Sequence, residues 1–390
     1  YVHNIATAER TGGTIEPQVM NQWFVAVNKP FVLPHSEFAA IPSGSETTLK
    51  EIMRKAVESG RISPQTGETE TIKILPEHFD KTYYHWIDNL NDWCISRQIW
   101  YGHRIPVWYR SKSGKVLEKT IDLHPADTDL EIHCGVEAPA DSTDASSGWI
   151  QDEDTLDTWF SSGLWSFSTM GWPNAWDEAT HAAKPGSDLA AFHPTDVLVT
   201  GHDILFFWVA RMILMTGYGL GTIPFKTVYL NGMVRDAKGQ KMSKSLGNGG
   251  DPIVISEKYG ADALRMFYAM ASTPGTDSRI LEDKIKGFKH FGNKIWNITR
   301  FVLSAIAENP TTATLKFDKD FFAGQPMTPA DDDPMTPRHI RIWQEWKTAL
   351  ASISGHIDNY RIHLAAEEVY HYIWHTFADK VLEESKPVLN

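Results

Sequence analysis

Apolar residues recur with helical or strand spacing in several separate stretches of the chain. Helical spacing predicts a short helix over residues 50–59 and a longer one over residues 83–99 that ends near Gly102. Short apolar runs at residues 22–27 and 105–109 indicate strands. The amino-terminal third of the chain is therefore expected to mix short strands with helices.

The most informative pattern lies in the middle of the chain. A short buried strand at residues 197–200 leads through a glycine turn into a helix over residues 203–215 that is apolar on nearly every side. A second strand follows at residues 227–230, and strand, helix and strand in this order imply a parallel sheet. Ligands bind such sheets at the carboxyl ends of the strands, so residues 201–203 and 231–234 are expected on one rim.

The carboxyl-terminal part of the chain has a helical period. Long amphipathic helices are predicted over residues 261–270, 285–306 and 339–382. Residues 111–149, by contrast, are polar and rich in Asp, Ser, Gly and Pro, which is typical of a peripheral insertion or a long loop. The chain is therefore expected to hold an α/β domain followed by an all-α helix bundle.

The composition favours a soluble globular protein over a membrane-spanning or disulfide-rich one. A chain of 390 residues with 42% hydrophobic and 22% charged residues is typical of a soluble globular protein of two or three domains. The densest apolar stretch, residues 204–215, is too short to span a bilayer, so no membrane association is expected. Cys94 and Cys134 are the only cysteines, too few for a disulfide framework or a four-cysteine zinc site. The chain starts at Tyr1 without a signal pattern, which indicates a processed terminus or a fragment.

Charge is unevenly distributed along the chain. The formal net charge is −12, yet residues 226–300 contain 13 basic and 7 acidic residues, a local net charge of +6. A basic segment in an acidic protein is typical of a surface that faces phosphate groups. A solvated surface of mixed charge fits the same count, so the segment is a candidate for nucleic-acid contact with that alternative left open.

A loop with two lysines follows the second predicted strand. Residues 241–245 read KMSKS and come directly after a glycine-containing turn at residues 237–240. Two movable lysine charges beside a nucleotide-type crevice suit the neutralisation of a phosphate chain in a transition state. Taken alone, such a loop is more often a solvated turn.

Five blocks of sequence, found in order along the chain, favour the phosphate-binding interpretation of this loop over a solvated turn. They are NDWCISRQ at 91–98 with GHRIP at 102–106, DTLDTWFSS at 154–162, TGHDILFFWVARM at 200–212, KMSKS at 241–245 and LGN at 246–248. Together they resemble the class I aminoacyl-tRNA synthetases, of which KMSKS is a signature, and the third block is similar to the valine-type enzymes in particular. The isoleucine-type enzymes usually have Gln-His where Ile204 and Leu205 stand here.

The resemblance implies an ATP site around the KMSKS signature. Lys244 should contact the ATP phosphates with Lys241 assisting, which makes these two lysines the candidate catalytic residues. Ser243 and Ser245 should take part in ATP binding on the same loop.

The resemblance places the rest of the nucleotide on the rim of the sheet. Gly201 and Asp203 should hold the adenosine ribose, because a carboxylate suits two vicinal hydroxyls. Met233 and Val234 lie where the family lays its backbone against adenine. These four residues complete the candidate ATP site.

Two tryptophans carry the implied amino-acid specificity. Trp159 and Trp208 match the indoles that wall the valine side chain in the family, with ordinary core packing as the alternative for each. The implied reaction converts valine and ATP, with Mg²⁺, into valyl-adenylate and pyrophosphate and then moves the valyl group to the terminal adenosine of tRNA(Val). The implied partners are therefore valine and tRNA(Val), and a cytoplasmic monomer is expected.

The resemblance also implies a domain organisation with a Rossmann-like catalytic domain. The expected parts are the end of an editing insertion (1–22), the second part of the catalytic domain (23–270), a stem-contact region (271–300) and a truncated anticodon-binding helix bundle (301–390). Relatives often carry cysteine-rich zinc knuckles near residues 7–13 and 114–147. Because Cys134 is the one cysteine in these two segments, no zinc is predicted.

Two alternative functions stay open. The first signature of the family, His-Ile-Gly-His, would precede Tyr1, so residues 1–390 alone are expected to be inactive in adenylate formation. One alternative is therefore a truncated, non-catalytic module that only binds tRNA, and the upstream coding sequence would distinguish it. The other is an isoleucine-type ligase, which the sequence of Phe206, Phe207 and Trp208 disfavours.

Overall fold

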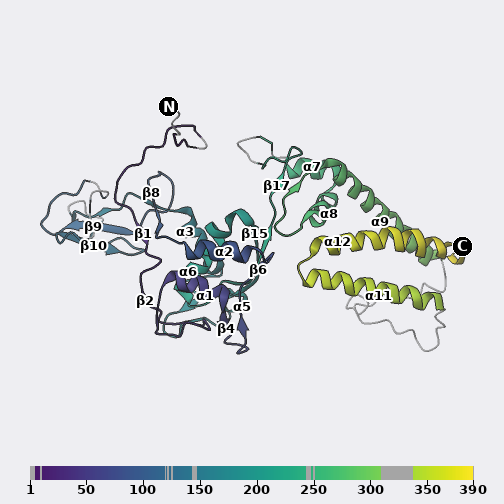
Figure 1. The fold of residues 1–390 in the computed structure, drawn as a ribbon, viewed down its shortest axis with the longest axis horizontal. Helices are drawn as coiled ribbons and strands as arrows, with labels where there is room; N and C mark the ends of the chain where they lie inside the picture. The colour runs from purple at the N-terminus through teal and green to yellow at the C-terminus, as the bar shows by residue number, and fades with distance from the viewer. Residues whose placement is uncertain are drawn as a thin grey trace. The chain divides into compact units, whose positions relative to one another are not determined.

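The computed structural model divides the chain into two compact units. It describes residues 5–8, 11–118, 120, 123, 126–142, 147–242, 247–248, 251–308 and 337–389. The first unit comprises Tyr1–Leu198 and Ile204–Val228, and the second comprises Val199–Asp203 and Tyr229–Asn390 (Figure 1). Strands β15 (Thr195–Gly201) and β16 (Phe225–Asn231) run from the first unit into the second. Their carboxyl ends therefore belong to the second unit.

The first unit mixes short strands with helices, as predicted. Its helices are α1 (Leu49–Glu58), α2 (Phe79–Asp88), α3 (Thr158–Gly163), α4 (Trp165–Ser168), α5 (Asp188–Phe192), the π-helical turn η3 (Leu205–Val209) and α6 (Ala210–Leu220). Its remaining strands are β1 (Phe24–Val25), β2 (Phe31–Val32), β3 (Glu46–Thr47), β4 (Arg61–Ile62), β5 (Thr69–Glu70), β6 (Lys73–Leu75), β7 (Trp93–Cys94), β8 (Ser96–Arg97), β9 (Val107–Ser111), β10 (Leu130–Cys134), β11 (Ile150–Gln151), β12 (Thr155–Leu156), β13 (Trp176–Asp177) and β14 (Ala182–Ala183).

The predicted strand–helix–strand unit is confirmed, but the prediction that its first strand is buried is wrong on one face, because Val197 and Val199 are exposed while Leu198 and Thr200 are buried. Strands β15, β16 and β6 form one sheet in that order. The amide of Thr195 donates to the carbonyl of Pro224 over 3.1 Å, so β15 and β16 begin side by side, as in a parallel pair joined by a helix. Phe225 and Val228, which point to opposite faces of β16, are fully buried, so this strand is covered on both faces.

The apolar helix of this unit is longer and less regular than predicted. After a 3-10 turn at His202–Ile204 (η2), η3 precedes α6, and Gly221 ends the helix with a φ of 69°. The helical run His202–Leu220 has the length and composition of a membrane span, but 61% of it is buried inside the structure. That degree of burial is typical of the core helix of a domain. An added Cβ at Gly217 would lie 2.3 Å from Ile52 Cγ2, so the glycine lets α1 pack closely on α6.

The helix predicted over residues 83–99 is wrong in its second half. Helix α2 ends at Asp88, and its last turn is closed by the amide of Asn89, which donates to the carbonyl of His85. Residues 93–97 form strands β7 and β8, which pair antiparallel with β1 and β12. The apolar spacing here fits a helix locally, but pairing with distant strands decides the structure.

The polar stretch at residues 111–149 is built on a small sheet. Strand β10 pairs antiparallel with β9 (Figure 1). Strand β11 pairs with the other edge of β9. Val107 and Tyr109 of β9 and Leu130 of β10 form, with Ile105, a separate buried apolar cluster. Residues 111–149 are thus in part a folded hairpin and not simply a long loop.

The second unit is predominantly helical, which confirms the predicted carboxyl-terminal bundle. Its elements are β17 (Val234–Arg235), α7 (Pro252–Tyr259), α8 (Ala261–Ala271), β18 (Ser278–Arg279), α9 (Glu282–Glu308), α11 (Pro337–Asp358), α12 (Ile362–His371), the π-helical segment η4 (Tyr372–Leu382) and α13 (Glu383–Leu389). Helices α11 and α12 lie side by side after a break at Tyr360, whose φ is 57° (Figure 1). Tyr370 packs on Phe288 and Phe291 of α9 and so joins α12 to α9.

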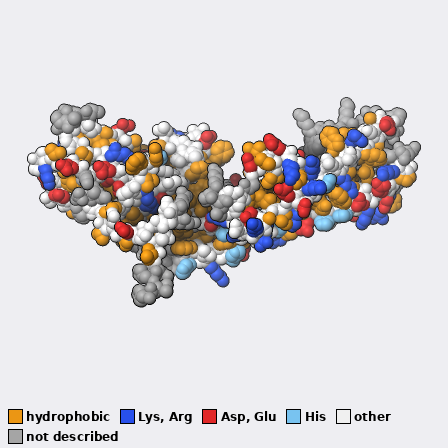
Figure 2. Space-filling view, turned by 90° about the horizontal axis from the view of Figure 1, so that it is seen from above, with side chains coloured by type: hydrophobic (Ala, Val, Ile, Leu, Met, Phe, Trp, Pro, Cys, Tyr) orange, Lys and Arg blue, Asp and Glu red, His pale blue; other side chains and the backbone are white. Residues whose placement is uncertain are grey.

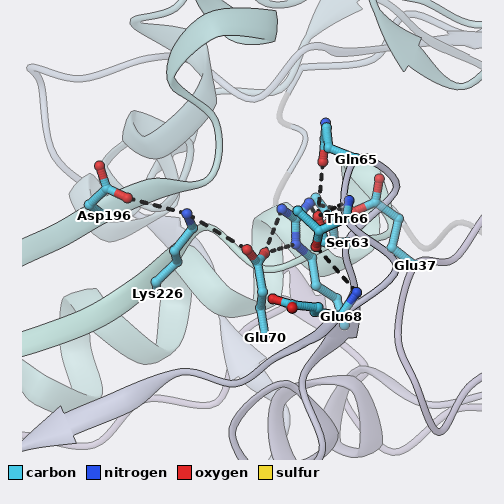
Figure 3. Close-up of polar contacts among 10 residues, drawn as sticks. Glu37, Ser63, Gln65, Thr66, Glu68, Glu70, Asp196 and Lys226 are labelled. Atoms are coloured by element: carbon cyan, nitrogen blue, oxygen red, sulfur yellow. Dashed lines mark hydrogen bonds and ion pairs between the residues drawn. The ribbon is translucent and has the colours of Figure 1, made fainter.

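An ion-pair network is centred on the buried Arg61 in the first unit. Arg61, which is 5% exposed, pairs with Glu37 and Glu70 at 2.7 Å each. Figure 3 shows Lys226 between Glu70 and Asp196, with separations of 3.7 and 3.3 Å. This cluster, called here the Arg61 network, ties the β4–β5 hairpin to strand β16 and to the loop at Glu37.

Stability should depend on pH through His193, which lies close to the Arg61 network. Burial, and then the charge of Arg61, lower the pKa of His193 from 6.5 to about 4, and its Nε2 atom has no hydrogen-bond partner among the described residues. The unfolded chain takes up this proton at a higher pH than the folded chain. The contribution to stability is therefore complete above pH 6.5 and is lost as the pH falls toward 4.

We expect His193→Leu to weaken the fall in thermal midpoint between pH 6.5 and 4. The pKa of His35 is also lowered by burial, so part of the dependence should remain. Thermal melts of both proteins across this range measure the difference. Parallel curves for the two proteins would contradict this assignment.

Candidate functional site

The nucleotide rim, defined as residues 201–203 and 231–235, lies in the second unit. At Gly201 an added Cβ would lie 2.7 Å from Asp203 Oδ1 and 3.5 Å from Met233 Sδ. A side chain there would displace the Asp203 carboxylate, so the glycine keeps that carboxylate at the end of β15. The two segments of the predicted rim are thus next to each other in the fold.

Lys241 faces the carboxylate that was assigned to the ribose. Its Nζ lies 3.1 Å from Asp203 Oδ2, and the two side chains are 57% and 37% exposed. An isolated antiparallel bridge joins Arg235 to Lys241 across the turn at residues 236–240. This bridge fixes the first lysine of the KMSKS sequence beside the rim.

Asp236 closes the base of the same loop. Its carboxylate accepts from the Gln240 amide at 2.8 Å and from Asn248 Nδ2 at 3.0 Å, and Asn248 also donates to the Lys241 carbonyl. The Gln240 amide is the main reason that the pKa of Asp236 is lowered. Residues on both sides of the KMSKS loop are therefore tied to one carboxylate.

The predicted ATP residues fall into two groups. Those within the described residues are Gly201, Asp203, Met233, Val234 and Lys241. Gly201 lies next to both Asp203 and Met233, and Lys241 contacts Asp203. Val234 follows Met233 in the chain, as the first residue of β17. The others, Ser243, Lys244 and Ser245, lie outside the described residues, so their roles stay predictions.

Asp277 contacts the nucleotide rim and was missed by sequence reasoning. Its Oδ1 accepts from the Met233 amide at 2.8 Å and lies 3.3 Å from His202 Nε2, and its Oδ2 accepts from Arg235 Nε at 2.6 Å. The pKa of Asp277 is lowered, first by the hydrogen bond from the Met233 amide and then by Arg235 and His202. The one local signal is a turn at Pro274 and Gly275, which is compatible with many loops.

The predicted valine-pocket residues belong to an aromatic cluster in the first unit. Trp159 on α3 stacks on Phe207 of η3 with ring centroids 5.8 Å apart. Trp208 meets Trp165 edge to face at 5.8 Å and donates its Nε1 proton to the Ser162 carbonyl at 3.0 Å. Trp159 and Trp208 are both half-buried, as expected of side chains that can also contact a ligand.

A buried carboxylate supports this aromatic cluster. Asp157 accepts from Trp93 Nε1 at 3.1 Å, from an Arg97 guanidinium nitrogen at 2.8 Å and from the Trp159 amide at 3.2 Å. The guanidinium of Arg211 lies 3.9 Å from the centre of the Trp93 ring, and burial lowers its pKa to about 10. Asp157 therefore fixes the first turn of α3, where Trp159 lies.

The basic segment at residues 226–300 is partly neutralised within the fold. Arg235, Lys241, Lys258 and Lys294 pair with Asp277, Asp203, Glu282 and Asp379 in that order. Figure 2 shows basic and acidic side chains intermixed on the face that it presents. The count of basic residues therefore overstates the charge that this segment offers to a nucleic acid.

Comparison with known families gives two matches. The family model described as tRNA synthetases class I (I, L, M and V) matches residues 13–281, and the anticodon-binding domain of tRNA ligase matches residues 340–390. In the solved structures, the apo form of Mycobacterium tuberculosis methionyl-tRNA synthetase aligns over 95% of this chain and 54% of its own, with 14% identity and a TM-score of 0.53. An Agrobacterium radiobacter LeuRS complexed with tRNA and LeuAMS covers 73% of this chain and 36% of its own, with 19% identity and a TM-score of 0.51. At these identities the likeness shows the fold alone.

Curated relatives match over the whole chain. The valine–tRNA ligase of Clostridium tetani is 39% identical over 389 residues, which is 100% of this chain and 36% of the relative. The valine–tRNA ligase of Symbiobacterium thermophilum is 41% identical over 390 residues, or 99% of this chain and 35% of the relative. The chain thus spans about 36% of the length of the curated relatives that it matches. With the family model covering more than half of its residues, the chain belongs to the class I tRNA synthetases (I, L, M and V).

Proposed function

We propose that the protein containing this chain is a ligase that joins valine to tRNA(Val) at the expense of ATP. The observation that carries the proposal is identity of 37–41% to valine–tRNA ligases over nearly the whole chain. The geometry supports it, because the predicted ribose, adenine and phosphate residues of the described part gather on one rim. The relatives' names favour valine over isoleucine.

The reaction begins when a carboxylate oxygen of valine attacks the α-phosphorus of ATP and pyrophosphate leaves. Asp203 accepts hydrogen bonds from the ribose hydroxyls. The phosphates are bound by two lysines and two serines of the KMSKS loop, and the lysines neutralise part of the phosphate charge: Lys241, Lys244, Ser243 and Ser245. ATP enters with Mg²⁺, which offsets part of that charge. The Met233 amide already donates to Asp277 and the Met233 carbonyl accepts from the Ser278 amide, so adenine lies against the backbone of Met233 and Val234 and forms its hydrogen bonds with Val234. The valyl group then passes to the terminal adenosine of tRNA(Val).

Partners and location follow from the same proposal. The helices of the second unit, part of which matches an anticodon-binding domain, would contact tRNA, with affinity that falls as salt rises. A cytoplasmic monomer without zinc remains our expectation. A protein that only binds tRNA would give no pyrophosphate exchange at all, so the assay below separates it from a ligase.

The test is amino-acid-dependent exchange of pyrophosphate into ATP by the full-length protein. Valine should support exchange, and isoleucine and leucine should support far less. A preference for either of those two amino acids, or exchange with none of them, would overturn the proposal.

Trp208→Ala should admit isoleucine into activation. One methylene in an apolar pocket is worth about 10–200-fold in discrimination, a range for which the aminoacyl-tRNA synthetases are themselves the standard example. We therefore expect the kcat/KM of exchange with isoleucine, relative to valine, to rise within that range. Trp149→Ala, a matched control beside Arg110 and Asp141 in the β9–β10 sheet, should leave the ratio unchanged. Continued refusal of isoleucine by a folded Trp208→Ala protein would assign this tryptophan to the core.

A further inference from the structure

The Asp277 carboxylate joins the two segments of the nucleotide rim. Its Oδ1 receives the Met233 amide from one segment and lies 3.3 Å from His202 of the other. His202 stands between Gly201 and Asp203, the two residues assigned to the ribose. Asp277 therefore contacts both segments of the rim: residues 231–235, called here the adenine segment, and residues 201–203, called here the ribose segment.

The backbone around Asp277 is fixed by close packing. Strand β17 pairs in parallel with β18, with Val234 opposite Ser278. The Ser278 amide donates to the Met233 carbonyl at 3.0 Å, so Met233 is bonded on both sides of its backbone. An added Cβ at Gly232 would lie 1.7 Å from the Thr276 carbonyl oxygen. The backbone just before β17 is therefore packed directly against the backbone just before β18. The carboxylate has little freedom to move away from the rim.

Arg235 links Asp277 to the turn that precedes the KMSKS loop. Its guanidinium binds Asp277 Oδ2 at 2.5 Å and donates to the Gly239 carbonyl at 3.2 Å. Gly239 belongs to the turn that precedes Lys241, and its φ of 81° favours glycine. Asp277 thus reaches the base of the phosphate loop through one intermediate side chain.

We propose that Asp277 is a positioning residue for ATP, which holds the adenine segment, the ribose segment and the base of the KMSKS loop in their binding geometry. This inference rests on the proposed function, because ATP is the substrate which that function requires. Asp277 need not touch the nucleotide. It acts through Met233, His202 and Arg235, whose partly buried hydrogen bonds to the charged carboxylate fix the rim before ATP binds.

The test is steady-state pyrophosphate exchange by the full-length protein with Asp277→Ala and Asp277→Asn. For Asp277→Ala we expect the KM for ATP to rise about 10-fold, with the KM for valine within about 2-fold of its original value, because lost preorganisation weakens binding of the nucleotide alone. Asp277→Asn keeps an acceptor for the Met233 amide but loses the charge that Arg235 faces. Its KM for ATP should therefore lie between those of the wild type and Asp277→Ala.

Asp379→Asn is the matched control, since Asp379 also binds a cation, Lys294 at 2.8 Å, but on the helices η4 and α9. It should leave the KM for ATP unchanged. A merely structural role for Asp277 would lower the amount of active protein, and hence the apparent kcat, without separating the two KM values. If Asp277→Ala does not fold, Asp277→Asn carries the same comparison.

Equilibrium binding of ATP to each protein, measured by calorimetry, separates this inference from the proposed function. An unchanged KM and an unchanged affinity for ATP in a folded Asp277 variant would overturn the inference and leave the ligase proposal standing. If the wild type shows no valine-dependent exchange but binds ATP, and Asp277→Ala alone weakens that binding, the ligase proposal fails and the positioning role is supported.

Discussion

Replacing Arg61 with methionine is expected to lower the free energy of unfolding of the first unit by about 3 kcal/mol. Arg61 is buried and pairs with both Glu37 and Glu70. Removing one partner of a buried ion pair costs about 3–5 kcal/mol when the remaining charge is left unpaired, and here Glu70 keeps one cation, Lys226 at 3.7 Å. The two carboxylates are 19% and 23% exposed, so water can solvate them in part, which places the loss at the low end.

Urea-induced unfolding, combined with hydrogen exchange resolved to residues 61–75, measures this loss and locates it. Arg54→Met is the control, because Arg54 pairs with Asp88 on the surface and is 40% exposed. Exposed pairs contribute about 0–1 kcal/mol, so the control should shift the unfolding midpoint little. Equal shifts for the two variants would mean that the Arg61 network does not stabilise the unit.

The sequence was most informative where the pattern of burial is local. Strand β16 is buried on both faces, and α6 is apolar around most of its circumference, so both could be recognised without knowledge of their neighbours. The place of the rim also followed from position, because residues 201–203 come at the end of a strand of the predicted sheet, whereas the ribose role of Gly201 and Asp203 came from the family resemblance and stays a prediction. Contacts between these residues then agree with the predicted rim.

Sequence reasoning failed where distant pairing decides the structure. Trp93 and Cys94 have helical spacing with residues of α2, but they pair with β1, far earlier in the chain. The support of Trp159 by Asp157 was missed for a related reason, since Trp93 and Arg97 reach the same carboxylate from another segment. A residue's type can be read from the sequence, whereas the partners that hold it depend on the fold.

Asp277 is the clearest case of this limit. The residues that it binds stand some 40 or more positions earlier in the chain, and the parallel pair β17–β18 that brings them together has only two residues in each strand. Strands this short give no periodic signal. An isolated acidic residue after a turn therefore looked like ordinary loop sequence, although it contacts both segments of the rim.

Lys244→Ala should lower the rate of valine-dependent pyrophosphate exchange by about 10²–10³-fold, or about 3 kcal/mol of transition-state stabilisation. The basis is the KMSKS sequence, whose second lysine we propose to contact the charge that develops on the phosphates. Because this charge grows in the transition state, kcat should fall while the KM for valine stays near its original value. Lys241→Ala should cost less, since its Nζ is already paired with Asp203 at 3.1 Å.

Steady-state pyrophosphate exchange with the full-length protein, with valine and ATP each varied in turn, would measure these effects. Lys258→Ala serves as the control for loss of one lysine, because Lys258 pairs with Glu282 at 2.6 Å, at the start of α9. That variant should exchange pyrophosphate at the original rate. If Lys244→Ala also does so, the lysine is not at the phosphates. The charge there must then come from Lys241 or from the metal that accompanies ATP, and the KMSKS loop would serve to position the nucleotide without stabilising the transition state.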